Sequence, residues 1–475
     1  MGDSVEDLAD ELTKLSVQDS HNIDRHFNKE LFQVSMKDRN AMTEELHGVS
    51  TLAREESPEF LEEKLREFSN ELDAVSNDNP LKAAYLESQL FSNTYVNGSD
   101  FRLRFLRCEL FDAKKSITRM LNFLSHTSDL FGPQVLERPI QIADFFKEDL
   151  DYMRLGNLQV LPLRDRSGRP IYTWVGDFDA KHGWKVIHKV SLYLHYIMSD
   201  DVESQQKGAI KLIWRANGFA GNESVRYSLE CVKFNKKLFD SIPIRSAAVH
   251  VCVPNTPIFL LFKAGYNLAT RGNTSKAKIR FHYGEEIELL YHLKGYGIPI
   301  ELIPVHTDGD IKTKYLKQWM QVRKKLEQDC AFPDGSMIVL PGSHDVLFRK
   351  GESLMYHPGN SNFRGYIESR KQEHSTASQT RKKAITDSII RIVQDKGGRF
   401  LEWNKRGWWM ELGPSQIQAK VANQVRKFKL KSTATMKHEI RSSTYQFQNQ
   451  DNAKAKRRKI SPHSDGYCFC LTCDD

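Results

Sequence analysis

Residues 101–132 read FRLRFLRCELFDAKKSITRMLNFLSHTSDLFG, and this stretch decides the fold of the N-terminal half. The stretch begins with an apolar helix that also contains arginines. Asp112 follows as the N-cap of a second helix, because a carboxylate there accepts the free N–H groups of the first helical turn. The apolar positions of the second helix recur at spacings of three and four, which places them on one stripe. They are Ala113, Ile117, Met120, Leu121 and Leu124. The stretch therefore predicts a packed helical pair.

Length and composition narrow the class of protein. The chain has 475 residues, enough for about three domains. Its longest apolar runs, such as residues 258–262, are far shorter than the ~18 residues that span a bilayer. The acidic start MGDSVEDLADEL resembles neither a secretory signal nor a transit peptide. The seven scattered cysteines favour a reducing compartment, so we expect an intracellular protein.

Charge is distributed unevenly along the chain. Residues 1–76 hold 19 acidic and 8 basic side chains, whereas residues 331–460 hold 25 lysines and arginines against 11 acidic side chains. A basic half favours phosphate-bearing partners, either nucleic acid or anionic lipid. Two solvated ends whose charges offset one another explain the same counts equally well.

The N-terminal part divides into two segments. Residues 1–57 are rich in Asp, Glu, Ser and Asn and lack a sustained apolar period, which predicts an acidic disordered segment. A helical N-terminal lobe follows over residues 58–135. Pro58 starts its first helix, and Gly132-Pro133 ends the lobe.

From residue 158 the pattern alternates between strands and helices. We expect strands at 158–163, 170–175, 209–214, 246–253 and 278–282. We expect helices at 184–198, 225–239, 256–268 and 285–293. Alternation of this kind predicts an α/β fold, a mixed sheet with helical crossovers over residues 136–308.

A small α+β module completes the chain after a linker helix within residues 309–335. The module covers residues 336–431, and a disordered basic and cysteine-containing tail covers 432–475. Within the module we expect a helix–helix–hairpin–helix unit. Its segments are a strand at 337–340, a turn at 357–360, helices at 363–370 and 381–396, hairpin strands at 399–403 and 408–412, and a last helix from Pro414.

Five segments, in this order, resemble the CRAL-TRIO (Sec14-like) lipid-binding family. They are LRFLRCELFDAKK, DRSGRPIYTWVGDFD, AIKLIWRANGF, SAAVHVCVPNTPIFLLFKAGYNL and KIRFHYGEEIELL, within residues 81–304. The resemblance implies a helical lobe, a mixed sheet, and one lipid or similar apolar molecule in a cavity under a movable helix. Residues 297–304 depart from the family's LPxxYGG-like ending, which argues against phosphoinositide selectivity but not against the pocket.

The resemblance also assigns roles to residues. The lipid-binding set is Leu212, Trp214, Phe259, Leu260, Phe262 and Tyr266. A headgroup would contact Arg104, Arg107 and Lys263. The alternative is a plain core helix at 256–268 with three ordinary surface cations. The strand period of two places Leu212 and Trp214 on one face of the sheet and Ile213 on the other.

The segments HDVLFRKGESLMYHPGNSNFRGYI and KGGRFLEWNKRGWWMEL resemble an uncharacterised domain family over residues 342–429. Cations beside tryptophans suit nucleic acid through phosphate pairing and base stacking. The cations are Arg399, Lys405, Arg406, Arg426 and Lys427, and the aromatic residues are Trp403, Trp408 and Trp409. Equally, the tryptophans form the core of a small domain.

The tail carries two further motifs. Residues 454–459 (KAKRRK) are typical of a nuclear-localisation signal or a polybasic membrane patch. Cys468, Cys470 and Cys473 have ligand types that suit zinc but lack paired CxxC spacing, so we expect no metal and no cofactor other than a bound lipid.

No GxSxG, HExxH or Walker motif occurs in the sequence, so we expect a protein that is not an enzyme. The leading hypothesis is an intracellular lipid-binding or lipid-transfer protein, cytoplasmic and peripheral to an anionic membrane. The alternative is a nuclear, nucleic-acid-associated regulatory protein that acts through the basic module. The partner of this module is then either a nucleic acid or a protein.

Overall fold

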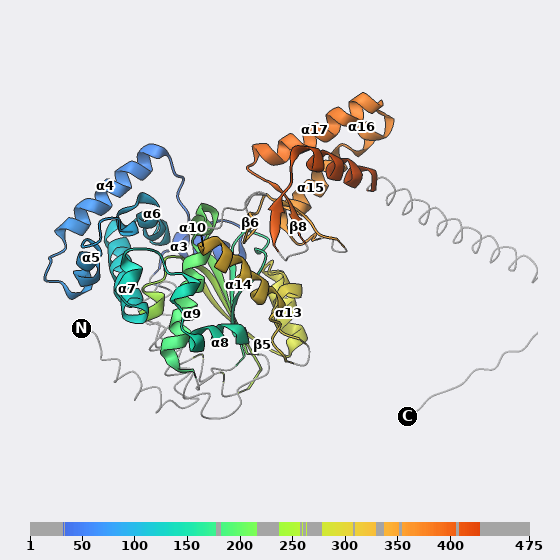
Figure 1. Ribbon diagram of the computed structural model, residues 1–475. Helices are drawn as coiled ribbons and strands as arrows, with labels where there is room; N and C mark the ends of the chain where they lie inside the picture. Colours follow the sequence, from blue (N-terminus) through green and yellow to red (C-terminus); the bar gives the residue numbers. More distant parts are fainter. Residues whose placement is uncertain are drawn as a thin grey trace, which may run out of the picture. The chain divides into compact units, whose positions relative to one another are not determined.

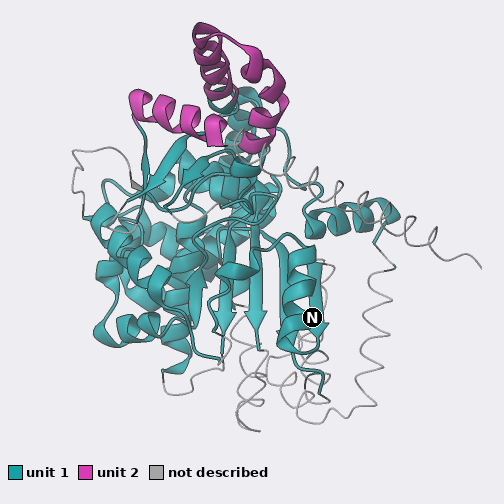
Figure 2. Cartoon of the chain, turned by 90° about the vertical axis from the view of Figure 1, so that its right-hand side faces the viewer, with its two compact units in different colours: residues 1–362, 393–412 teal, residues 363–392, 413–475 magenta. Residues whose placement is uncertain are grey.

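The computed structural model describes residues 32, 34–176, 182–215, 237–256, 259, 263, 278–306, 309–328, 337–350, 354–404 and 408–427. The chain divides into two compact units (Figure 2). Unit 1 comprises Met1–Asn362 and Val393–Leu412, and unit 2 comprises Phe363–Ile392 and Gly413–Asp475. Within the described residues, no helix combines the length and apolarity needed to cross a membrane. The architecture is mixed α/β, as predicted.

The helical lobe follows the sequence closely. Its main helices are α4 (Pro58–Ala74), α5 (Ala83–Ser88), α6 (Ser99–Cys108) and α7 (Ala113–Phe131). Asp112 caps α7, accepting a hydrogen bond from the backbone N–H of Lys115 at 3.1 Å. The predicted stripe of α7 is buried and packs against α4 and α6.

Five strands form the large sheet in the order β1-β2-β3-β4-β5 (Figure 1). Strands β2 to β5 run parallel to one another, and β1 pairs antiparallel with β2. The strands are β1 (Leu158–Val160), β2 (Ile171–Val175), β3 (Ala209–Trp214), β4 (Ser246–Val253) and β5 (Ile279–Tyr283). Right-handed connections between parallel strands in chain order all lie on one side of a sheet. We call this side the crossover face.

Helices cover both sides of the large sheet, with α9 on one side and α13 on the other (Figure 1). On the crossover face, α9 and the lobe share a core with Tyr172 and Trp174. On the opposite side, called the α13 face, Leu289 and Leu293 pack near Leu212. The remaining helices of this part are α8 (Lys147–Leu155), α9 (Gly183–Met198), α10 (Val202–Lys207), α13 (Glu286–Gly295) and α14 (Lys314–Glu327).

Helix α3 (Met36–His47) lies inside the segment predicted to be disordered, so that prediction is wrong here. Ser35 caps the helix, and Leu46 is buried in the core of the α13 face. Its mean hydropathy is low and it shows no apolar stripe. The sequence therefore contains no periodicity from which α3 could be predicted.

Buried ion pairs hold α3 across the amino edge of the parallel strands. The Glu45 carboxylate, 1% exposed, pairs with Arg245 and with Lys278, whose Nζ lies 2.6 Å from Oε2. Arg245 and Lys278 directly precede β4 and β5. Arg169, just before β2, donates to the backbone carbonyl of Glu45.

A second, smaller sheet belongs to unit 1 and has the order β6-β9-β8-β7. The predicted hairpin is present as the antiparallel pair β8 and β9. Strand β7, parallel to β8, was not predicted, because three residues are too few for a recognisable period. The strands are β6 (Met337–Ile338), β7 (Val346–Phe348), β8 (Phe400–Trp403) and β9 (Trp409–Glu411).

Unit 2 is helical over its described residues. The chain enters it along α15 (Pro358–Ser369), and the predicted turn at 357–360 is wrong, because Pro358 takes the first helical position, which suits its fixed φ. Helices α16 (Lys371–Thr376), α17 (Gln379–Asp395) and residues 414–427 follow. The apolar side chains buried in this unit include Ile385, Ile389, Ile417, Val421 and Val425.

Candidate functional site

The crossover face of β3, β4 and β5 carries a continuous apolar surface. The parallel register places Ile213 beside Val251, and Val251 beside Phe281. Phe259, from the connection between β4 and β5, is 1% exposed and belongs to the same hydrophobic cluster. The cluster is distinct from the large core around α7 and α9 and comprises Ile213, Val249, Val251, Val253, Phe259, Ile279, Phe281 and Tyr283.

The two edges of the large sheet differ. Helix α3 covers the amino edge through Glu45 and its two cations. Val253 and Tyr283 are the last residues of β4 and β5, so the apolar cluster extends to the carboxyl edge.

Lys211 is a charged side chain on the crossover face of β3. Lys211 pairs in register with Tyr172 and Val249, is 3% exposed, and has no hydrogen-bond partner for its Nζ. That nitrogen lies 4.1 Å from the ring centre of Phe239. Burial, reinforced by the charge of Arg119, lowers the pKa of Lys211 to about 7. Lys211 was not predicted as a site residue, because a single lysine in a strand is usually exposed.

The structure separates the predicted lipid-binding residues. Leu212 and Trp214 are buried in the core of the α13 face, whereas Phe259 packs on the crossover face. The expected alternation is confirmed, since Ile213 lies on the face opposite Leu212. The set as a whole does not line one cavity. Leu260, Phe262 and Tyr266 lie outside the described residues.

Trp214 instead lines a hollow of about 210 Å³ on the α13 face, at the carboxyl end of β3. Its indole nitrogen is buried without a hydrogen-bond partner. The other lining residues are Glu286, Leu290, Ile300, Ile303, Val305, His306 and Lys312. Neither Leu212 nor Phe259 lines this hollow, so it is separate from the crossover-face cluster.

The predicted headgroup cations are engaged inside the protein. Arg107, 7% exposed, donates through Nε and Nη2 to Glu56 and through Nη1 to Gln205. Arg104 pairs with Asp200 at 3.1 Å and lies over the ring of Tyr196. These two arginines therefore fasten the lobe to its neighbours. Lys263 is half-buried, and its surroundings lie outside the described residues.

Histidines gather on the α13 face. His250 Nδ1 lies 3.0 Å from His282 Nε2, and both rings approach Tyr296. Burial lowers the pKa of His282 to about 4 and that of His250 well below its ordinary value, so both are neutral at pH 7. Within the described ranges, no three His, Cys, Asp or Glu side chains are placed to hold a metal ion.

Of the predicted nucleic-acid residues, Arg399 belongs to unit 1, and Arg426 and Lys427 belong to unit 2. Arg399 binds Asp345 through two nitrogens, at 3.2 and 2.8 Å, which ties β8 to the start of β7. Arg426 and Lys427 are exposed at the end of the last helix, in unit 2. Lys405 and Arg406, like Cys468, Cys470 and Cys473, lie outside the described residues.

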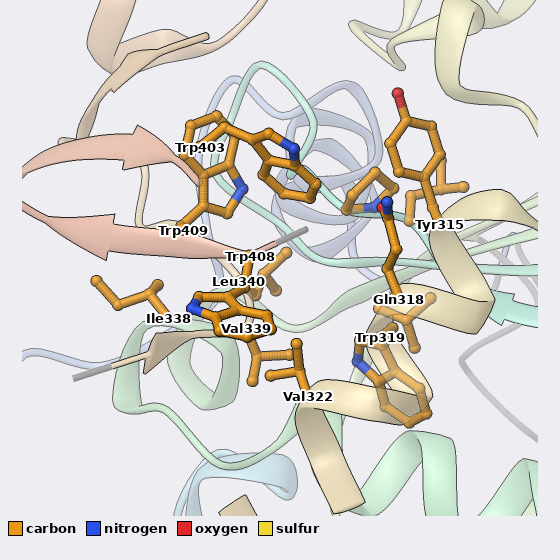
Figure 3. Close-up of a pocket in the computed structure, with 13 residues that line it drawn as sticks. Tyr315, Gln318, Trp319, Val322, Ile338, Val339, Leu340, Trp403, Trp408 and Trp409 are labelled. Atoms are coloured by element: carbon orange, nitrogen blue, oxygen red, sulfur yellow. The ribbon is translucent and has the colours of Figure 1, made fainter. Parts of the chain in front are cut away.

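The tryptophans of the hairpin line a small pocket of about 40 Å³ beside α14 (Figure 3). Trp408 and Trp409 are buried, and Trp403 meets Trp409 edge to face at 5.1 Å. Lys325 lies 5.0 Å from the ring centre of Trp408. This arrangement supports the prediction that the tryptophans are core residues.

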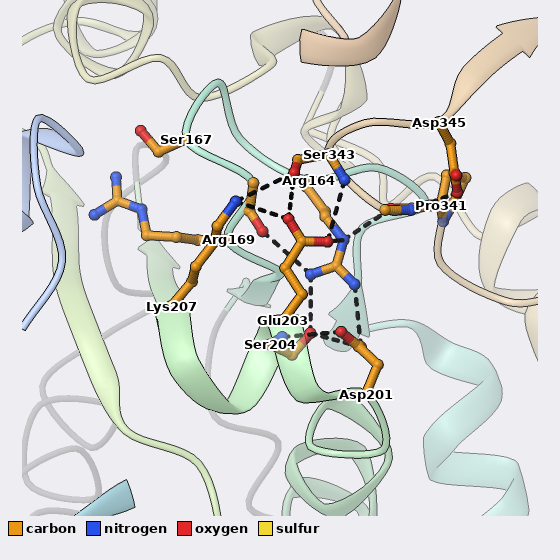
Figure 4. A network of polar contacts seen from close by, with 12 residues as sticks. Arg164, Ser167, Arg169, Asp201, Glu203, Ser204, Lys207, Pro341, Ser343 and Asp345 are labelled. Carbon is orange, nitrogen blue, oxygen red and sulfur yellow. Dashed lines mark hydrogen bonds and ion pairs between the residues drawn. The ribbon is translucent and has the colours of Figure 1, made fainter. Parts of the chain in front are cut away.

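A buried arginine joins the large-sheet region to the segment before β7 (Figure 4). Arg164, 1% exposed, donates to the carbonyl of Pro341 at 2.7 Å and to Asp201 at 3.0 Å. Glu203 accepts from the backbone N–H of Ser343. Because these groups satisfy one another, the network is structural.

The motif residues of the C-terminal segment meet at Asp345. Asn360 exchanges two hydrogen bonds with the backbone of Leu347. A Cβ on Gly359 would lie 2.0 Å from the carbonyl oxygen of Asp345, and one on Gly398 would lie 2.3 Å from that of His344. Both positions therefore require glycine.

Residues 345–427 match a family described as a domain of unknown function (DUF6824). The matched range contains the Asp345, Gly359, Asn360 and Gly398 cluster, whose contacts are structural. No curated protein matches the chain.

Proposed function

We propose that this chain binds one apolar, lipid-like molecule on the crossover face, beside Phe259. The observation that carries the proposal is the cluster around Phe259. Seven apolar side chains of β3, β4 and β5 form a surface that reaches the carboxyl edge of the sheet, and Phe259 packs against it from the connecting segment.

The two edges of the sheet indicate from which side a ligand would enter. The amino edge is covered by α3 and its buried ion pairs. A ligand would therefore reach the crossover face from the carboxyl edge, past Val253 and Tyr283. In this proposal the chain carries or exchanges its ligand, in contact with a membrane surface, and does not transform it.

The test is to purify the full-length chain, extract it with organic solvent and quantify lipids by mass spectrometry. Phe259→Asp should reduce the lipid content about tenfold or more, because a carboxylate would have to be buried against the ligand. Ile287→Asp is the matched control, since Ile287 is 61% exposed on α13. Equal lipid content in wild type and Phe259→Asp would refute the assignment.

The alternative function, nucleic-acid binding through the basic module, has a separate test. Affinity for a DNA duplex that falls steeply with salt, together with no extractable lipid, would favour it. Salt-sensitive DNA binding requires several cations on phosphates at once. Arg399 is not available for this, because Asp345 holds it.

A further inference from the structure

Lys211 has no counterion among the described residues. No carboxylate among the described residues lies within 4 Å of its Nζ. Arg119, whose charge acts on Lys211, is held by Glu109 and the carbonyls of Phe239 and Ile242. An unpaired ammonium in an apolar interior is costly, and a partner charge removes much of that cost. The fold therefore leaves one electrostatic position unfilled on the crossover face.

A second polar atom without a partner lies on the same side. His195, on α9, is 1% exposed, and its ring centre is 4.4 Å from that of Tyr172, which is the register neighbour of Lys211. Its Nδ1 lies 2.7 Å from the carbonyl oxygen of Ser191, so Nδ1 carries the proton and Nε2 is an acceptor. Nε2 has no hydrogen-bond partner.

The geometry points to a ligand that carries a carboxyl group: we propose that the apolar molecule is a long-chain carboxylic acid and that Lys211 binds its carboxylate. This inference rests on the proposed function and specifies its ligand. A carboxylate accepts from the Lys211 ammonium, and a carboxylic acid can also donate its O–H to His195 Nε2. The two side chains therefore suit either protonation state of the headgroup.

The register also gives the orientation of the acid. Lys211 lies two residues nearer the amino edge than Ile213, whose row contains Val251 and Phe281. The carboxylate would therefore enter first and the hydrocarbon chain would extend over the apolar row toward the carboxyl edge. A neutral lipid in the same place would leave the ammonium unpaired.

The experiment offers the delipidated full-length chain an equimolar mixture of oleic acid and oleyl alcohol and measures the bound ratio by mass spectrometry. Wild type should prefer oleic acid about tenfold or more, the effect of one charge-assisted hydrogen bond. Lys211→Met should bind both ligands equally, whereas Lys185→Met, at an exposed position of α9, should behave as wild type.

The outcomes separate the two proposals. If wild type binds neither ligand, the proposed function fails. If both ligands bind and Lys211→Met keeps the preference for the acid, only the role of Lys211 is refuted. Should Lys211→Met fail to fold, the lipid extracted from wild type decides: a carboxylic acid supports the inference, and a neutral lipid overturns it.

Discussion

Replacing Glu45 by glutamine tests whether buried ion pairs hold α3 on the large sheet. The substitution leaves Arg245 and Lys278 buried without their common carboxylate. Removing one partner of a buried pair costs about 3–5 kcal/mol. Arg245 still donates to the carbonyl of Gln206 at 2.8 Å, and the new amide can still accept from the backbone N–H of Leu52. We therefore expect the free energy of unfolding to fall by about 3 kcal/mol, near the lower end of this range.

Guanidinium unfolding of the full-length chain, followed by tryptophan fluorescence, measures this loss of stability. The denaturant concentration at the midpoint should fall, and the dependence of the unfolding free energy on denaturant should stay unchanged. Glu44→Gln is the control, because Glu44 is an exposed neighbour on the same helix. A difference between Glu45→Gln and Glu44→Gln below about 1 kcal/mol, the range of exposed pairs, would refute the reasoning.

The difference in stability between Glu45→Gln and Glu44→Gln should depend on pH. Burial acts to raise the pKa of Glu45, but Arg245 and Lys278 outweigh it, so the pKa lies below its ordinary value of 4.5. The stabilisation is therefore fully present above pH 4.5 and is lost as the pH falls through the lower pKa of the folded chain. The two variants should converge in stability in acid.

Three further substitutions test other parts of the structure. Gly359→Ala should destabilise the chain by about 3 kcal/mol, because its Cβ meets backbone, whereas Gly365→Ala, in the same helix with open space, should be neutral or stabilising; similar melting temperatures would contradict this. Asp112→Ala should cost about 1 kcal/mol through the lost cap and Asp112→Asn much less; equal losses on thermal unfolding would argue against capping. The pKa of Lys211 in the folded chain is lowered to about 7. Between pH 7 and 10, Lys211 is therefore deprotonated in the folded chain and protonated in the unfolded chain. Wild type should therefore gain stability relative to Lys211→Met as the pH rises from 7 to 9, by at most about 1.4 kcal/mol per unit, and a constant difference would refute the shift.

The sequence predicts best where packing is apolar and periodic. Strands β3 and β4 have the bounds expected from their apolar runs, and Asp112 caps α7 as its position before a stripe indicates. Helix α3 escaped prediction because its anchor is one carboxylate whose partners lie 200 and 233 residues away. Sequence periodicity cannot register such a contact.

The candidate site was predicted only in part for a related reason. The period of two separates Ile213 from Leu212 and Trp214, but which of the two faces meets Phe259 depends on the order of the strands and the hand of their connections. Lys211 and His195 become notable only through missing partners, which is a property of three-dimensional surroundings. In the sequence, Arg104 and Arg107 cannot be distinguished from surface cations. In the structure, Arg104 pairs with Asp200 and Arg107 pairs with Glu56.

Photo-crosslinking with a long-chain fatty acid that carries a diazirine in its tail tests the central claim most directly. The full-length chain is irradiated with the probe, digested, and the labelled residues are identified by mass spectrometry. We predict labels on the crossover face, at Val251, Phe259 or Phe281. Labels confined to the α13 face, around Leu212 and Leu289, or no label at all, would contradict a ligand on the crossover face beside Phe259.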